Sequence, residues 1–196
     1  MFFFSLIVIF IFSFSMDPKE IVAVIPGIIW VAFGFTSIIG IGRCFLPEVS
    51  NDCIEYLQMV PIPKGIIYIG KFIGNCLFLV CIELFLYPLF IVFFNLDVLE
   101  KLPQLLLVSL LATVGLSALG TLFSALTVQI RAREVMLPVL VLPLAVPIFI
   151  GAVESTRGVF NGESFLMYRP WLDLLAVFDL VFVTVSFWVF EYVLDD

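Results

Sequence analysis

The chain has 196 residues, of which 63% are hydrophobic and 13% are charged, and its formal net charge is −7. Soluble domains are about half apolar and about a quarter charged, so this composition excludes an ordinary soluble fold and predicts a protein embedded in lipid. Nine Lys and Arg scattered along an acidic chain do not form the basic patch of a nucleic-acid binder, and the absence of histidine excludes His-based acid–base chemistry and His ligands for a metal or haem.

Six apolar segments follow one another at about residues 1–16, 21–42, 66–94, 104–128, 135–153 and 171–190. Each approaches or exceeds the length of a helix that crosses a bilayer, and only a helix satisfies its own backbone in lipid at this length. The first segment would rise only about 24 Å, so we expect a clipped first helix. Because it lacks a basic start and a cleavage site, it is not a typical signal peptide. The sequence therefore predicts an all-α membrane protein, a bundle of about six transmembrane helices in one domain (1–196).

Charge gives a weak indication of orientation. Six spans place both termini on one side, and that side carries five Lys and Arg against four on the other. Cytoplasmic segments are enriched in Lys and Arg, so this slight excess favours cytoplasmic termini.

The polar connection 43–65 predicts a short amphipathic helix beside the membrane. Asp52 and Glu55 have the spacing of a capping box, Leu57 belongs to one apolar face, and Pro61 stops the helix. In ATP-driven transporters such a helix docks into a groove on a motor subunit, whereas the alternative is a helix that lies on the lipid surface. The candidate coupling residues of this loop are Arg43, Glu48, Asp52, Glu55, Leu57 and Pro61.

The fourth segment carries hydroxyl side chains at intervals of four residues, at Ser109, Thr113, Ser117 and Thr121. This spacing places them on one stripe of a helix, where another helix can approach closely. The stripe is either a subunit interface or moving contact, or ordinary packing within the chain.

The fifth segment contains three prolines, Pro138, Pro143 and Pro147. Each removes a helix hydrogen bond and can bend the axis, so a kinked helix could line a cavity. Prolines are also common in membrane helices that have no such role.

Three ionisable residues fall inside predicted spans. Lys71 is close enough to a helix end to reach the membrane surface, whereas Glu83 and Asp179 lie deeper. The two carboxyl groups could serve a proton or substrate path, or they could meet a partner charge from another helix or subunit. The sequence does not show whether they meet each other.

Four blocks in order resemble the haem exporter protein B family (CcmB), the membrane subunit of the cytochrome c maturation ABC system. The blocks are residues 25–32, the loop from Arg43 through Glu55, Leu57 and Pro61 to Lys71, residues 125–128 leading to Arg131, and residues 140–154 with Pro143 and Pro147. Together they lie within about residues 21–160.

The resemblance implies an ABC-2-like permease subunit in a bacterial inner membrane, with a CcmA-type ATPase, CcmC- and CcmD-type membrane subunits and a CcmE-type haem chaperone as partners. Haem would be the transported ligand rather than a bound cofactor, and a homodimer is compatible with this reading. We expect no enzyme activity and no metal site in the chain, because nucleophile and metal motifs and a phosphate-binding loop are missing, so ATP would be bound by a partner subunit. The alternatives are an ABC-2 permease for a lipid or glycan, or a membrane scaffold that transports nothing.

Overall fold

The computed structural model of the chain describes residues 2–15, 21–46, 63–94, 99–128, 130 and 132–193. Over these residues it contains α-helices and one 3-10 helix but no strand, which confirms the predicted all-α fold. In chain order the elements are α1 (Phe2–Ser15), α2 (Ile21–Ile41), α5 (Lys64–Phe94), η1 (Leu99–Lys101), α6 (Leu102–Leu126), α7 (Arg133–Phe160) and α8 (Phe165–Val193).

Five of these helices, α2 and α5 to α8, are long and apolar enough to cross a membrane. Helix α1 is equally apolar but has 14 residues, so it rises only about 21 Å. The described part of the chain is therefore a multi-pass membrane bundle.

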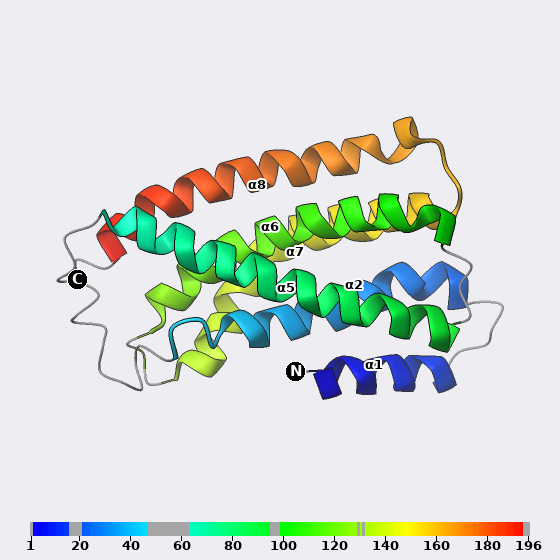
Figure 1. Cartoon of the computed structure of the whole chain (residues 1–196), viewed down its shortest axis with the longest axis horizontal. Coiled ribbons are helices and arrows are strands. Elements are labelled where there is room, and N and C mark those ends of the chain that lie inside the picture. The colour runs from blue at the N-terminus through cyan, green and yellow to red at the C-terminus, as the bar shows by residue number, and fades with distance from the viewer. Residues whose placement is uncertain are drawn as a thin grey trace.

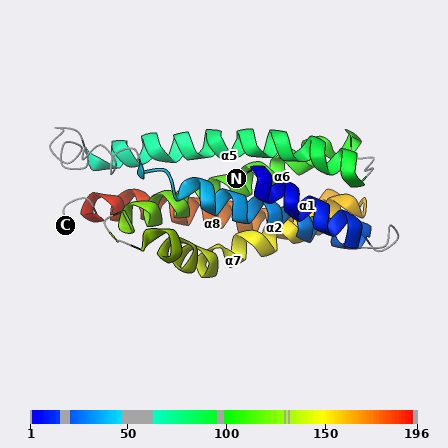
Figure 2. The same cartoon turned by 90° about the horizontal axis from the view of Figure 1, so that it is seen from below.

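Successive helices run antiparallel and form one elongated bundle (Figure 1). Helix α6 lies at its centre and contacts α2, α5, α7 and α8, whereas α1 packs on α2 and α5 at the edge. The end of α2, the start of α5, the end of α6 and the start of α7 share one end of the bundle (Figures 1 and 2). Most residues of α2 and α6 are buried inside the bundle, whereas most residues of α5, α7 and α8 are at least partly exposed on its outside.

Small and hydroxyl residues allow the inner helices to approach closely. A Cβ added at Gly120 of α6 would lie 2.6 Å from Cγ2 of Ile41, so α2 could not pack at this distance against a larger residue. The buried hydroxyls of Ser5 and Thr36 are hydrogen-bonded over 2.6 Å and join α1 to α2.

The last two helices extend beyond their apolar segments, so the connection expected at 154–170 shortens to residues 161–164. Helix α7 continues through Glu154 and Arg157, whose side chains form a 2.6 Å ion pair one turn apart. A helix can continue into polar sequence because its backbone hydrogen bonds do not depend on the lipid. Prolines 138, 143 and 147 all lie inside α7, and Figure 2 shows that this helix is bowed rather than straight.

Candidate functional site

A row of buried hydroxyl groups runs along α6 and faces the inside of the bundle. Ser109, Thr113, Ser117 and Thr121 are each at most 2% exposed. They lie on one stripe because four residues are slightly more than one helical turn. A hydroxyl buried away from water is costly unless it is hydrogen-bonded, so the neighbours of this stripe determine its stability.

Helix α5 supplies partners for three members of the row, whereas the hydroxyl of Ser117 has no hydrogen-bond partner among the described residues. The amide Nδ2 of Asn75 donates to Oγ1 of Thr121 over 2.7 Å, and the hydroxyl of Thr113 donates to Oε1 of Glu83 over 2.6 Å. Asn75 and Glu83 are eight residues apart on α5, as Thr121 and Thr113 are on α6, so the antiparallel helices keep the same register over two turns. We call this α5–α6 contact, including the Tyr87–Ser109 pair described next, the polar seam.

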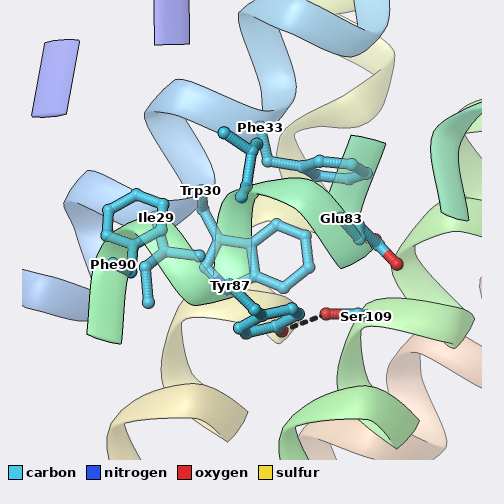
Figure 3. Close-up of a pocket in the computed structure, with 8 residues that line it drawn as sticks. Ile29, Trp30, Phe33, Glu83, Tyr87, Phe90 and Ser109 are labelled. Atoms are coloured by element: carbon cyan, nitrogen blue, oxygen red, sulfur yellow. Dashed lines mark hydrogen bonds between the residues drawn. The ribbon is translucent and has the colours of Figure 1, made fainter. Parts of the chain in front are cut away.

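Figure 3 shows the other end of the seam, where the hydroxyls of Tyr87 and Ser109 are hydrogen-bonded beside Glu83. These three side chains and an apolar wall from α2 that includes Trp30 line a cavity of about 10 Å³. That volume is about the minimum for a single water molecule. The cavity is therefore far too small for a substrate in this conformation.

Trp30 also connects α2 to α7. Its indole Nε1 donates to Oγ1 of Thr156 over 2.9 Å, and both side chains are buried. The tryptophan thus borders the small cavity beside the polar seam and uses the only polar atom of its side chain to bond to α7.

Asp179 of α8 is 6% exposed, and neither of its carboxyl oxygens has a hydrogen-bond partner in the structure. It lies against Gly115 of α6, where an added Cβ would be 2.5 Å from its Oδ1. A larger residue at position 115 would collide with this carboxyl group, so the glycine makes room for it.

Glu83 and Asp179 do not pair. Among the described residues no hydrogen bond or ion pair joins them, and they contact α6 at Thr113 and Gly115, which point in different directions on the helix. The described ranges hold no group of three His, Cys, Asp or Glu residues that could hold a metal ion.

Lys71 fixes the segment that follows α2. Its Nζ donates to the carbonyl oxygen of Cys44 over 2.9 Å and lies 4.9 Å from the ring centroid of Phe45. Asn75 Nδ2 also lies 3.3 Å from the sulfur of Cys44. One amide therefore contacts both this segment and Thr121 of the polar seam.

Of the six candidate coupling residues, Arg43 alone lies in a described range, where it is exposed. Glu48, Asp52, Glu55, Leu57 and Pro61, and with them the predicted amphipathic helix, lie outside the described residues.

The prolines of α7 occupy different surroundings. Pro138 lines a cavity of about 450 Å³ at the same end of the bundle as Arg43, which lines it too. Pro147 borders a groove between α7 and α8, and Pro143 is exposed.

Several contacts of the site escape the sequence patterns. Asn75 and Tyr87 are not among the expected site residues, although they lie at intervals of four residues with Lys71 and Glu83 on α5, interrupted by Leu79. Trp30 of α2 belongs to no such row. For Trp30 the available signal is a polar atom in a segment that lipid surrounds, because such an atom needs a partner inside the protein.

Comparison with known proteins places the whole bundle in context. The profile of the CcmB protein family matches residues 1–194. A heme exporter protein B from Pseudomonas aeruginosa is 28% identical over 179 residues, which are 89% of this chain and 80% of that protein. The proteins of that name from Rhodobacter capsulatus (31% over 175 residues, 88% of this chain and 78% of that protein) and Escherichia coli K12 (32% over 154 residues, 79% and 70%) are similar to it over comparable lengths.

Proposed function

Because the chain belongs to the CcmB protein family, we propose that it is the permease subunit of a haem-export complex that serves cytochrome c biogenesis. It is a multi-pass protein of a bacterial inner membrane. The observation that carries the proposal is the family match over almost the whole chain, together with relatives named heme exporter protein B.

The proposal includes a division of labour. A CcmA-type ATPase binds and hydrolyses ATP, this chain couples that ATPase to the membrane, and haem reaches a CcmE-type chaperone on the periplasmic side with CcmC- and CcmD-type subunits in the complex. The chain has no histidine, so haem contacts come from partner subunits or from weaker ligands. A subunit that transmits motion from a separate ATPase, and does not itself ligate haem through histidine, agrees with both observations.

The contacts around Lys71 support a route for that coupling. The loop 43–65 would touch the ATPase through Glu48, Asp52, Glu55 and Leu57. The hydrogen bond from Lys71 to Cys44 ties the start of this loop to α5, so a force on the loop would reach the α5–α6 contact first.

The docking claim is tested by co-purification of the ATPase with the chain. The double substitution Glu55→Lys and Leu57→Asp should abolish co-purification, because it reverses the charge and removes the apolar anchor. Glu163→Lys is the matched control, since Glu163 is exposed in the connection between α7 and α8 at the opposite end. Unchanged co-purification of the double variant would refute the docking claim.

The biological role is tested by haem staining of membrane and periplasmic fractions from a strain that lacks the chain. We expect all covalently bound c-type haem to disappear and to return with a plasmid copy. Normal c-type haem would instead favour an ABC-2 permease for a lipid or glycan. Normal maturation with an inactive ATPase partner would favour a scaffold that transports nothing.

A further inference from the structure

The cavity of about 450 Å³ is lined by residues from the end of α2, the end of α6 and the start of α7. Figure 1 shows that these helix ends share one end of the bundle. The volume of the cavity is within the range of about 300–1,000 Å³ that is usual for ligand pockets. The described residues that line it include two arginines and one glutamate, two hydroxyl residues and several apolar side chains, among them Arg43, Arg133, Glu134, Ile39 and Leu46.

The two arginines give this cavity an excess of positive charge. Arg43 and Arg133 come from different elements, and neither guanidinium forms an ion pair or hydrogen bond with the described residues. Glu134 lines the same cavity but forms no ion pair in that part of the chain. Two arginines beside one glutamate leave a net positive charge, which an anion would neutralise.

The remaining walls are apolar or already satisfied. The hydroxyl of Ser124 donates to the carbonyl oxygen of Ile41 over 3.3 Å, and that of Thr127 donates to Phe123 over 2.8 Å. Ile39 and Leu46 are partly exposed, at 40% and 38%, so the apolar wall continues to the outer surface of the bundle. A ligand that fits would combine a compact anionic group with an apolar part.

The depth of the cavity indicates which ligand this is. Helix α2 has 21 residues and rises about 31 Å, close to the thickness of the hydrocarbon core. Arg43 lies two residues beyond its end, and Arg133 is the first residue of α7. Both therefore lie at the level where lipid phosphates are found.

We propose that this cavity binds the headgroup of an anionic phospholipid, with its phosphate between Arg43 and Arg133 and its acyl chains along the wall of Ile39 and Leu46. Guanidinium groups bind phosphate through paired hydrogen bonds, and basic residues near the end of a span attract anionic lipid. The site is independent of the haem-export proposal, because it rests on the charge, volume and depth of the cavity.

Native mass spectrometry of the full chain, released from nanodiscs, tests the site. The nanodiscs contain phosphatidylglycerol and phosphatidylcholine in equal amounts. We expect the released chain to carry about tenfold more bound phosphatidylglycerol than phosphatidylcholine. The double variant Arg43→Gln and Arg133→Gln should lose this preference. The control Arg157→Gln and Arg169→Gln removes the same charge at the opposite end, where both arginines have acidic partners, and should keep it.

A second measurement needs no substitution. Phenylglyoxal modifies accessible guanidinium groups, so phosphatidylglycerol nanodiscs should protect Arg43 and Arg133 at least several-fold better than phosphatidylcholine nanodiscs. Equal retention of the two lipids by the unaltered chain would overturn the proposal, as would a preference that survives in the Arg43 and Arg133 variant. Displacement of the lipid by inorganic phosphate would assign the cavity to a free anion instead, and displacement by haem would assign it to haem.

Discussion

Thr113 of α6 donates a 2.6 Å hydrogen bond to the carboxyl group of Glu83 on α5, and both side chains are buried. This bond adds to the van der Waals packing of the two helices, whose association in lipid has no hydrophobic driving force. The stability of the polar seam should therefore depend on single polar contacts, which makes it testable by substitution.

Thr113→Val keeps the shape of the side chain and removes the hydroxyl. We expect the free energy of unfolding to fall by about 1–2 kcal/mol, because the carboxyl group of Glu83 loses its donor inside the bundle. Unfolding in mixed micelles with increasing SDS measures this change. Thr184→Val is the control, since Thr184 is exposed and, among the described residues, its hydroxyl bonds to nothing but the carbonyl of Leu180 in its own helix. Equal losses in the two variants would show that Thr113 contributes only packing.

Gly115→Ala should destabilise the bundle by about 1–3 kcal/mol, since the new Cβ would lie 2.5 Å from Oδ1 of Asp179 and 2.9 Å from Cδ1 of Ile148. Gly74→Ala is the matched control, because a Cβ there meets nothing within 4 Å. This control should be neutral or gain up to about 1 kcal/mol from helix propensity.

Adding Asp179→Ala to Gly115→Ala should recover part of the loss, because the collision with the carboxyl group disappears. Micelle unfolding of the two single variants and the double variant gives the coupling energy. A coupling energy near zero would mean that Gly115 and Asp179 do not constrain each other.

Lys71→Met should loosen the segment after α2. The variant loses the hydrogen bond to Cys44 and the interaction with the Phe45 ring, so backbone amides in residues 42–46 should exchange with solvent about tenfold faster. Hydrogen exchange followed by mass spectrometry measures this rate. Lys101→Met is the control, because Lys101 donates to the carbonyl of Phe160 at the other end of the bundle. Faster exchange of residues 42–46 in both variants would contradict a local role of Lys71.

Trp30→Phe removes the indole N–H, from which Thr156 accepts a hydrogen bond, and leaves a small gap in the packing. The expected cost is about 1–3 kcal/mol in the free energy of unfolding, again measured in mixed micelles. Trp188→Phe is the control and should cost less than about 0.5 kcal/mol, because Trp188 is 69% exposed. A larger loss at Trp188 would indicate that this exposed residue is held by a partner or by lipid more tightly than Trp30 is held by α7.

Sequence alone determined the long apolar helices that the structure describes and most of their bounds. The apolar segment predicted at 66–94 is α5 (Lys64–Phe94), and the one at 104–128 is α6 (Leu102–Leu126). Such segments can be recognised in a sequence because the thickness of a bilayer sets their length and because their backbone must form its hydrogen bonds within the segment. The α6 hydroxyls could also be placed on one stripe in advance, since the helical period depends only on the backbone.

Only the tertiary structure decided what that stripe faces. The spacing of Thr113 and Thr121 does not show that Glu83 and Asn75 are their partners, and the depth of Glu83 and Asp179 does not show that they contact α6 at different positions. Arg43 and Arg133 are likewise 90 positions apart in the chain, and they line the same cavity of about 450 Å³ only because α2 and α7 pack together. Hydropathy predicts which residues form each helix, because lipid is a uniformly apolar solvent. The rotation of a helix about its axis instead depends on contacts with particular neighbours.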